Sequence, residues 1–492
     1  MSKSQKLKDK LRENFEFNPT PQQDELINEI SDFVSTLGNR SIFLLKGYAG
    51  TGKTTLVSTL VKSLSVVAKR SSLLAPTGRA AKVLSGYSKK QAFTIHKKIY
   101  WIKTNSKGNT FVTLQENLNS NCIFIVDEAS MIPSHTDKGF GNRNLLADLI
   151  EYVYSGTDCK LILIGDTAQL PPVHLDMSPA LDDTILENDF NKQVIVKELT
   201  QVVRQKKDSL ILKNATQIRD MISEECFKYP KIECNEDVKR IVGGDELQEQ
   251  IERSYDTHGI EDTIVICKSN KRAYLYNQQI RHKILWKEER ISNGDYLMVV
   301  RNNYSWLDED SKAGFIANGD TVKVKHIRKY EELYGFNFAH ITIELVDYPE
   351  EPEIDVIVML DTLESEQAAL DYEKYKELYN LISQDYNSIK NTYKRNKAIK
   401  EDKYLNALQI KYAYAITCHK SQGGQWKSVF VEQSYFTDEM LNKEYFRWLY
   451  TSLTRSSEKL HLINFSEKFF VSKSYRSSYR VSACSFLKWH SI

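Results

Sequence analysis

The chain has 492 residues and a formal net charge of +2 at pH 7, with 67 Lys and Arg against 65 Asp and Glu. This length exceeds one ordinary hydrophobic core, so two to four folded units are expected. No apolar run approaches the roughly 18 residues of a membrane span, and the charged start MSKSQKLKDKLREN lacks a signal-peptide core. These features exclude a membrane-spanning class and predict a cytoplasmic protein, nucleoid-associated if bacterial, without membrane partners.

The near balance of charges does not by itself indicate a nucleic-acid partner. Any such partner would need a positive potential confined to a local groove. The seven Cys residues are odd in number and form no C-x-x-C pair, which predicts reduced structural thiols rather than a zinc cluster or a disulfide framework.

The first motif that carries chemistry is GYAGTGKTT, which follows the apolar run IFLL and precedes LVSTLVKSL, a stretch with helical spacing of apolar residues. In G-x-x-x-x-G-K-[ST], backbone N–H groups converge on phosphates at a helix N-terminus. Lys53 is expected to reach the β- and γ-phosphates of ATP, and the Thr54 hydroxyl to ligate Mg²⁺. The other nucleotide-binding candidates in the loop are Gly47, Gly50, Thr51, Gly52 and Thr55.

Two further strand-like runs end in polar residues. CIFIVDEASM supplies Asp127, which can hold the Mg²⁺ shell, and Glu128, which can orient and deprotonate water. LILIGDTAQLPPV supplies Asp166 and Gln169. Because an open α/β sheet binds its ligands at the carboxyl ends of its strands, we expect these residues to meet Lys53 at one edge.

The remaining motifs are LAPTGRAAKVL, FTIHKKI, ELTQVVRQ, AITCHKSQGGQW and LYTSLTRSSEKL, in that order. The series resembles the motifs of superfamily 1 helicases, and more narrowly those of the 5′-to-3′ branch that contains the Dda and RecD helicases. The resemblance runs from about Thr20 to about Ile463 and is weakest in 205–263 and 303–406.

The resemblance implies an α/β fold with two tandem RecA-like P-loop motor domains. The first would comprise 1–84 and 119–200 and carry a β-hairpin (pin) subdomain at 85–118. The second would comprise 201–286 and 405–492 and carry an insertion at 287–404, consisting of an SH3-like small β domain and long charged helices.

The residues themselves support parts of this division. IYWIKTNSKGNTFVTLQ alternates β-prone residues around NSKGN, which indicates a hairpin. It could separate strands, with Trp101 or Phe111 stacking on a base, or be a plain solvated hairpin. NGDYLMVV and IANGDTVKVKHI indicate short strands with N-G turns. The stretch 362–404, free of Gly and Pro, predicts exposed helices whose cations could face solvent, DNA or a partner.

The resemblance also assigns roles. Gln23 would read adenine, the alternative being an ordinary surface Gln that opens a helix. Gln169 would sense the γ-phosphate, and Arg204 and Arg455 would be arginine fingers that neutralise charge on the transferring phosphoryl group. DNA contacts would come from the first motor through Pro76, Thr77, Arg79, His96 and Trp101, and from the second through Thr417, His419, Lys420 and Ser421.

The expected function is that of a monomeric ATP- and Mg²⁺-dependent DNA helicase acting on single-stranded DNA and junctions. Its pathway stays open among DNA replication, DNA recombination, DNA repair and mobile-element transfer. The 5′-to-3′ polarity rests on resemblance alone. Protein partners are not identified, with single-strand-binding and replication or repair proteins as candidates. Two alternatives stay open: a translocase that displaces proteins but unwinds poorly, and a P-loop switch or kinase that does not track nucleic acid.

Overall fold

The computed structural model describes residues 1–38, 41–104, 110–133, 136–137, 143–203, 209–307, 311, 313 and 315–471. The chain divides into two compact units. Unit 1 comprises Met1–Lys207, Lys287–Ala413 and His419–Gly424, and unit 2 comprises Asp208–Trp286, Tyr414–Cys418 and Gln425–Ile492. Within the described ranges, no helix combines the length and apolar character needed to cross a membrane.

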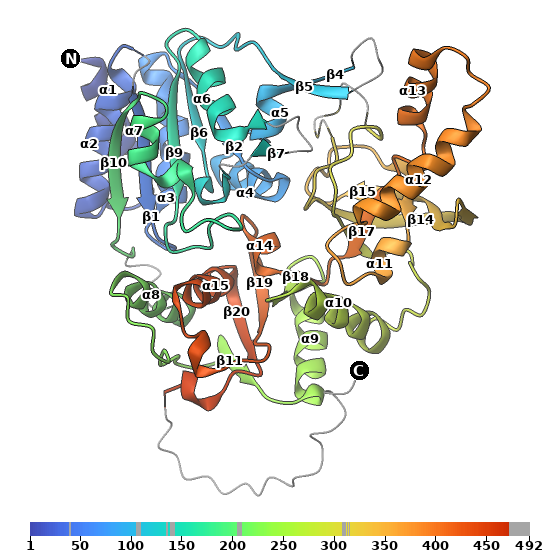
Figure 1. The fold of residues 1–492 in the computed structure, drawn as a ribbon. Helices are drawn as coiled ribbons and strands as arrows, with labels where there is room; N and C mark the ends of the chain where they lie inside the picture. The colour runs from blue at the N-terminus through green and yellow to red at the C-terminus, as the bar shows by residue number, and fades with distance from the viewer. Residues whose placement is uncertain are drawn as a thin grey trace, which may run out of the picture. The chain divides into compact units, whose positions relative to one another are not determined.

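Unit 1 is built on a parallel sheet with the strand order β10-β1-β9-β6-β2-β3 (Figure 1). Its central strands are continuous apolar runs, as expected when helices cover both faces of a parallel sheet. The strands are β1 (Ser41–Gly47), β2 (Arg70–Ala75), β3 (Ala92–Thr94), β6 (Cys122–Val126), β9 (Lys160–Gly165) and β10 (Gln193–Leu199).

Alternate residues of each strand face two separate cores, because side chains alternate along a strand. Phe43 and Leu45 of β1 pack with α1 (Lys3–Asn14), α2 (Pro21–Ser35), α3 (Lys53–Ser63) and α4 (Gly78–Ser88). Ile42 and Leu44 pack on the opposite face, with α5 (Ile95–Ile99), α6 (Leu145–Ser155) and α7 (Asp183–Asn188). This doubly covered sheet is the arrangement expected of a RecA-like domain.

The predicted hairpin is present as the antiparallel strands β4 (Tyr100–Thr104) and β5 (Thr110–Leu114). The predicted limits of 85–118 are too wide, however. β3 pairs in parallel with β2, so α4, β3 and α5 belong to the first sheet and its helices. Trp101 on β4 is 58% exposed. Residues 105–109, for which the sequence predicts a turn, lie outside the described residues.

A small β domain lies in the segment Lys287–Ala413. In the sequence this segment stands between two segments of unit 2, but it clusters with unit 1. Its strands close into a barrel in the order β13-β14-β15-β16-β17. This confirms the predicted small β unit, while its SH3-like character stays a prediction. The strands are β13 (Tyr296–Val299), β14 (Thr321–Leu333), β15 (Phe336–Leu345), β16 (Ile354–Met359) and β17 (Leu408–Tyr412). Because β17 closes the barrel, the predicted insertion boundary at residue 404 is too early.

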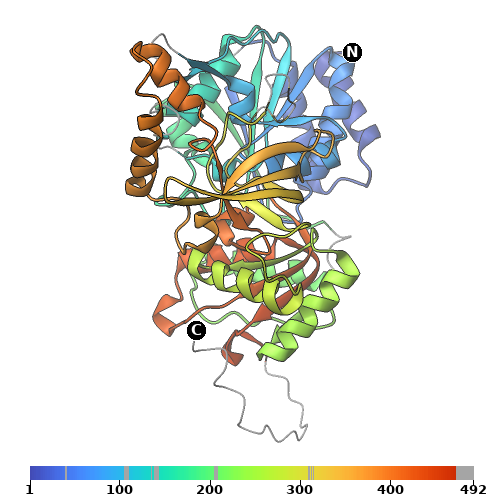
Figure 2. The same ribbon diagram turned by 90° about the vertical axis from the view of Figure 1, so that its right-hand side faces the viewer.

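The charged stretch before β17 forms α11 (Asp361–Glu364), α12 (Tyr372–Asp385) and α13 (Thr392–Glu401). Figure 2 shows α12 and α13 in orange. They are not solvated on all sides, because Leu378, Ile382 and Ile399 share an apolar core with Phe338 and Met359 of the barrel. The helices are therefore part of the β domain, with their charged faces outward.

Unit 2 contains a second parallel sheet, in the order β11-β20-β19-β12-β18. The strands are β11 (Val238–Ile241), β12 (Thr263–Cys267), β18 (Ala415–Thr417), β19 (Trp426–Glu432) and β20 (Ser456–Ile463). The accompanying helices are α8 (Leu210–Ser223), α9 (Gly244–His258), α10 (Asn270–Gln279) and α15 (Lys443–Leu453). Two parallel sheets with helices, one per unit, confirm the predicted α/β fold with tandem RecA-like domains.

Candidate nucleotide site and DNA-contact residues

Four of the predicted catalytic residues follow strands that end at the carboxyl edge of the unit 1 sheet, namely Lys53, Asp127, Glu128 and Gln169. β1, β9 and β6 are neighbours, and their ends are level because Lys46 is paired with Gly165 and Val126 with Leu163. The phosphate-binding loop follows β1, Asp127 follows β6, and Asp166 and Gln169 follow β9. The prediction that adjacent strand ends deliver these groups to one edge is confirmed.

The phosphate-binding loop depends on two glycines in left-handed conformations, Gly50 with φ 79° and Gly52 with φ 90°. Such angles suit glycine because other residues have a Cβ that clashes there. At Gly52 a Cβ would also lie 2.4 Å from Nε2 of Gln23. Lys53 begins α3, and its Nζ donates to the carbonyl oxygens of Gly47 (2.5 Å) and Tyr48 (2.8 Å). The ammonium group therefore lies within the loop.

The three threonines of the loop have different surroundings. Thr51 is buried and its hydroxyl donates to the carbonyl of Tyr48 at 2.8 Å, which closes the turn. Thr54 and Thr55 lie in the first turn of α3, and Thr54 is exposed. The Thr54 hydroxyl is thus accessible at the helix N-terminus, as a metal ligand would need to be.

Gln23 is buried at 3% exposure, so the alternative of an ordinary surface residue is wrong. It occupies the third position of α2 and completes a capping box with Thr20. Its Oε1 accepts from the Thr20 N–H at 2.9 Å, and its Nε2 donates to the Thr51 carbonyl at 3.0 Å. The side chain therefore ties α2 to the phosphate-binding loop. Its role in reading adenine stays a prediction.

Asp127 is held by two hydrogen bonds. Its Oδ1 accepts from the backbone N–H of Glu128 at 2.9 Å, and its Oδ2 accepts from the hydroxyl of Tyr87 on α4 at 2.5 Å. Glu128 has φ 54°, a left-handed conformation that is uncommon for a residue with a side chain and is frequent at functional sites. Sequence reasoning missed Tyr87, because its partner lies 40 residues further along the chain.

Gln169 has an unusual environment for a buried amide. Its side chain is 6% exposed, yet Oε1 makes no hydrogen bond within the part of the chain that the structure describes. Buried polar atoms normally have a partner, so an unpaired one at this edge fits a group supplied by a ligand. Oxygen donors from Thr54 and Asp127, the predicted metal ligands, also fit the hard-oxygen preference of Mg²⁺.

The first group of predicted DNA contacts lies at the ends of β2 and β3. Thr77, after the half-buried Pro76, is the N-cap of α4, and its hydroxyl accepts from the Ala80 N–H at 3.2 Å. Arg79 points one nitrogen toward Asp347, 4.0 Å away. His96 is half-buried on α5, and its ring centroid lies 5.8 Å from that of Tyr100. β2 and β3 are paired at Ala75 and Thr94, so these two motifs leave the sheet side by side.

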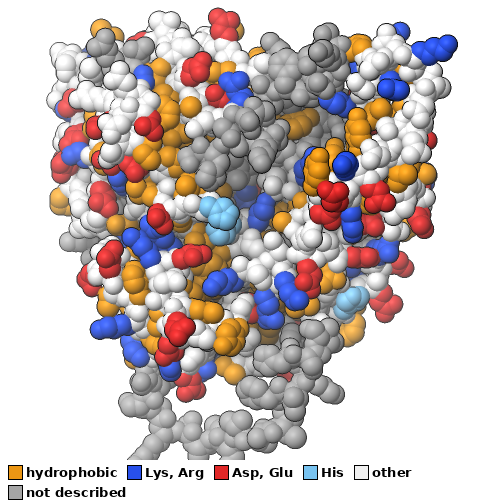
Figure 3. Space-filling view, viewed as in Figure 1, with side chains coloured by type: hydrophobic (Ala, Val, Ile, Leu, Met, Phe, Trp, Pro, Cys, Tyr) orange, Lys and Arg blue, Asp and Glu red, His pale blue; other side chains and the backbone are white. Residues whose placement is uncertain are grey.

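The second group divides between the units. Thr417 ends β18 in unit 2, whereas the segment 419–424 clusters with unit 1 instead of the second motor to which the sequence assigned it. Within unit 1, Gln422 Nε2 donates to the Leu170 carbonyl at 2.7 Å, and the exposed Lys420 donates to Asn318. His419 is exposed and Ser421 is fully buried. On the face shown in Figure 3, basic side chains are interspersed with acidic ones.

Only one of the two predicted arginine fingers lies in the part of the chain that the structure describes. Arg455, in unit 2, is 5% exposed and follows α15. Its Nε donates to the carbonyl of Thr451 at 3.1 Å and its Nη2 to the hydroxyl of Thr454 at 3.3 Å, so the guanidinium is tethered to the end of that helix. Arg204 lies outside the described residues.

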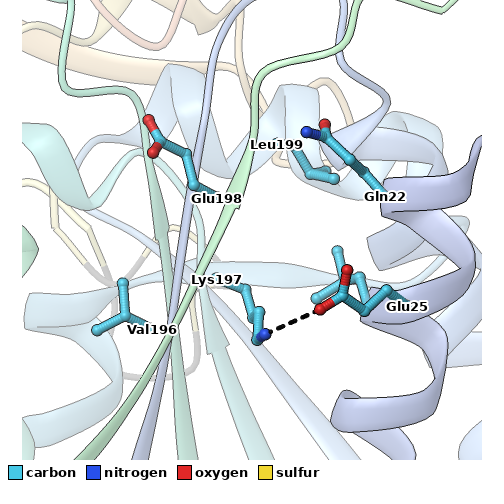
Figure 4. A pocket seen from close by; sticks show the side chains of 7 residues that line it. Gln22, Glu25, Val196, Lys197, Glu198 and Leu199 are labelled. Carbon is cyan, nitrogen blue, oxygen red and sulfur yellow. Dashed lines mark hydrogen bonds and ion pairs between the residues drawn. The ribbon is translucent and has the colours of Figure 1, made fainter.

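A pocket of about 230 Å³ lies between α2 and β10 (Figure 4). One of its lining residues, Gln22, directly precedes Gln23 in the sequence. Its Lys197 is already ion-paired, at 3.3 Å from Glu25 and 2.5 Å from Glu29. The pocket is lined by Gln22, Glu25, Leu26, Val196, Lys197, Glu198 and Leu199. None of the predicted site residues lines it, so we assign it no role.

The loop, the strand-end carboxylate and the unpaired Gln169 oxygen define a P-loop ATPase with a second RecA-like unit. A family model described as AAA domain matches residues 20–231, and one described as UvrD-like helicase C-terminal domain matches residues 412–463. The first match covers the six-stranded sheet of unit 1, and the second covers β18, β19 and β20 of the unit 2 sheet.

Three proteins are similar to parts or most of this chain. An uncharacterized protein of Acanthamoeba polyphaga mimivirus is 25% identical over 508 residues, covering 89% of this chain and 98% of that protein. The ATP-dependent DNA helicase dda of Enterobacteria phage T4 is 26% identical over 293 residues, covering 57% of this chain and 62% of that protein. The ATP-dependent RecD2 DNA helicase of Deinococcus radiodurans is 28% identical over 155 residues, covering 32% of this chain and 19% of that protein. By these matches the chain is similar to superfamily 1 helicases of the group that contains Dda and RecD.

Proposed function

We propose that the protein hydrolyses ATP with Mg²⁺, moves 5′ to 3′ along single-stranded DNA and separates duplex DNA at junctions. The observation that carries this proposal is the carboxyl edge of the unit 1 sheet, where Lys53, Asp127 and Gln169 follow three adjacent strands. Oε1 of Gln169 has no hydrogen-bond partner among the described residues. Two relatives of this chain are ATP-dependent DNA helicases. A second parallel-sheet unit supports a motor, because a simple P-loop switch needs only one.

In this function Nζ of Lys53 donates to phosphate oxygens in place of the loop carbonyls of Gly47 and Tyr48. Gln169 contacts the γ-phosphate through Oε1. Thr54 and Asp127 hold Mg²⁺, which supplies positive charge at the transferring phosphoryl group. Glu128 orients the attacking water and accepts its proton. Arg455, with Arg204, stabilises the charge that develops during transfer.

Along the DNA, Thr77 and His96 contact the strand from unit 1, together with His419 and Lys420. Thr417 contacts it from unit 2. Hydroxyls and a few cations suit a motor that must grip phosphates without reading bases. During each cycle of ATP hydrolysis, the contacts of unit 1 and those of unit 2 hold the DNA strand in turn.

The test couples ATP hydrolysis, with and without single-stranded DNA, to unwinding of duplexes that carry either a 5′ or a 3′ tail. Strong stimulation with unwinding from the 5′ tail alone is the expected result. Unwinding from the 3′ tail alone would overturn the polarity. Stimulation without unwinding would leave a translocase, and no stimulation would leave an ATPase that does not track DNA.

Lys53→Ala is the control for the site itself. The variant should lose ATP hydrolysis while keeping its affinity for single-stranded DNA, measured by fluorescence anisotropy, because Lys53 acts on phosphates of the nucleotide. Normal turnover in this variant would remove the loop from the catalytic site.

A further inference from the structure

Tyr87 is a polar contact of the nucleotide site that the resembled motifs do not account for. It lies in the last turn of α4, the helix that starts at the predicted DNA contact Thr77. Its hydroxyl donates to Oδ2 of Asp127 at 2.5 Å. The other oxygen of the same carboxylate accepts from the Glu128 N–H at 2.9 Å. Both oxygens of Asp127 are therefore oriented by donors from the protein.

The position of the Tyr87 ring is set by packing. The ring lies against the apolar core that α1, α2, α3 and α4 form on one face of the sheet. This packing aims the Tyr87 hydroxyl at Oδ2 of Asp127, which, when the carboxylate is ionised, can only accept the hydrogen bond.

An ionised carboxylate can accept more hydrogen bonds than the two that Asp127 receives from the protein. Its two oxygens offer about four acceptor positions, of which Tyr87 and Glu128 use two. The remaining positions can accept a metal ion or a metal-bound water. Hydrogen bonds to the ligands of a metal ion fix their orientation, and losing one typically costs about 10–100-fold in metal affinity or activity.

We propose that Tyr87 is a positioning residue for Mg²⁺, holding the Asp127 carboxylate ready for the metal that accompanies the nucleotide. The proposal rests on the proposed function, in which Asp127 is the metal ligand. Tyr87 does not touch the substrate. It acts through Asp127, so its removal should weaken metal binding and leave the chemistry at saturating metal largely intact.

Tyr87→Phe removes only the hydroxyl and keeps the packed ring. With ADP present, we expect the affinity for Mn²⁺, measured by electron paramagnetic resonance, to fall about tenfold. The Mg²⁺ concentration that half-saturates ATP hydrolysis should rise by a similar factor, with kcat at saturating Mg²⁺ changing less than about twofold. Unchanged Mn²⁺ affinity would overturn the proposal.

Tyr154→Phe is the matched control. It removes a hydroxyl that donates to the Ser41 carbonyl at 2.6 Å, elsewhere in unit 1. An equal loss of Mn²⁺ affinity in both Phe variants would mean general loosening of the unit and overturn the role of Tyr87.

Asp127→Asn separates this proposal from the one on which it rests. If Asp127→Asn loses Mn²⁺ affinity and Tyr87→Phe does not, the metal site stands and the positioning role fails. If neither variant loses it, Asp127 is not the metal ligand, and the proposed site fails as well.

Discussion

Gly423 lies against Ala80, although the two residues come from motifs far apart in the sequence. A Cβ at position 423 would lie 2.6 Å from Cβ of Ala80 and 3.4 Å from the hydroxyl oxygen of Thr77. Gly423 also has φ 72°, in the left-handed region. Two of the predicted DNA-contact motifs, APTGRAA and HKSQGG, therefore meet within unit 1, and only glycine allows the approach.

Gly423→Ala should consequently disturb this junction. The added methyl group both strains the backbone and collides with α4, so we expect a loss of about 1–3 kcal/mol in the free energy of unfolding and weaker stimulation of ATP hydrolysis by single-stranded DNA. Urea unfolding and DNA-dependent ATPase assays measure the two effects.

Gly86→Ala, which changes a glycine of α4 itself, is the control. A Cβ there would meet nothing within 4 Å. Because alanine favours a helix interior over glycine, this variant should gain about 0.5–1 kcal/mol in stability and keep its DNA response. Equal behaviour of the two variants would mean that the Gly423 contact has no special importance.

Asp320, at the contact between the barrel and α4, makes the stability of the folded state depend on pH. Burial, then the nearby Asp347, raises the pKa of Asp320 to about 7, although its carboxylate accepts from the Ala317 N–H at 2.7 Å. Arg79 and Lys82 lie 4.0 and 3.6 Å from Asp347. Between the ordinary value of 3.8 and about 7 the folded state binds more protons than the unfolded state. Stability from this group is therefore present at low pH and is lost as pH rises through that window.

Asp320→Asn removes the ionisation and keeps an acceptor for Ala317. We expect the variant to be more stable than the wild type by about 1–3 kcal/mol at pH 8, with the difference vanishing near pH 4. Urea unfolding midpoints across this pH range measure it. Glu332→Gln changes an exposed carboxylate on the same barrel and should show no such gain. A pH-independent difference for Asp320→Asn would show that the carboxyl does not titrate in this window.

The parts of the site that follow strand ends were predictable, because a strand and its terminal polar residues are contiguous in sequence. Lys53, Asp127 and Gln169 fall into this class. The contact of Tyr87 with Asp127 and the burial of Gln23 were not, because each depends on how a helix packs against a loop. Gly423 carried a signal, the glycine pair in HKSQGG, but its partner at Ala80 could not be identified from the sequence.

The domain boundaries that failed have a similar cause. The last barrel strand, Leu408–Tyr412, runs into β18 at Ala415 without a Gly or Pro to mark the change of domain. The strand Ala92–Thr94 is only three residues long and is followed at once by α5, so no alternating pattern could reveal it. Composition marks boundaries only where a loop intervenes.

Arg455→Ala tests the second unit. If the guanidinium stabilises transferring charge, the variant should bind ATP normally and hydrolyse it about 10³-fold more slowly. Single-turnover and steady-state ATPase assays separate these steps. Because Arg455 also bonds to Thr451, thermal unfolding must confirm that unit 2 remains folded. Arg253→Ala, which removes an exposed arginine of α9, should leave hydrolysis unchanged. Turnover within about twofold of wild type would exclude Arg455 from the site.

Trp101→Ala tests the hairpin. Trp101 is 58% exposed and is paired with Thr113 across the two strands, so its indole ring is available to stack on a base. Loss of a base stack of about 1–3 kcal/mol should slow unwinding of a 5′-tailed duplex roughly tenfold. Stimulation of ATP hydrolysis by single-stranded DNA should not change, because strand separation and translocation use different contacts.

Tyr435→Ala, which removes an exposed aromatic ring of unit 2, is the control and should unwind normally. Normal unwinding by Trp101→Ala would mean that Trp101 does not act at the junction and would favour the plain solvated hairpin. A parallel loss of ATPase stimulation would instead place Trp101 on the path of the translocating strand. The ratio of unwinding rate to ATP consumed distinguishes these cases, since only a junction contact lowers that ratio.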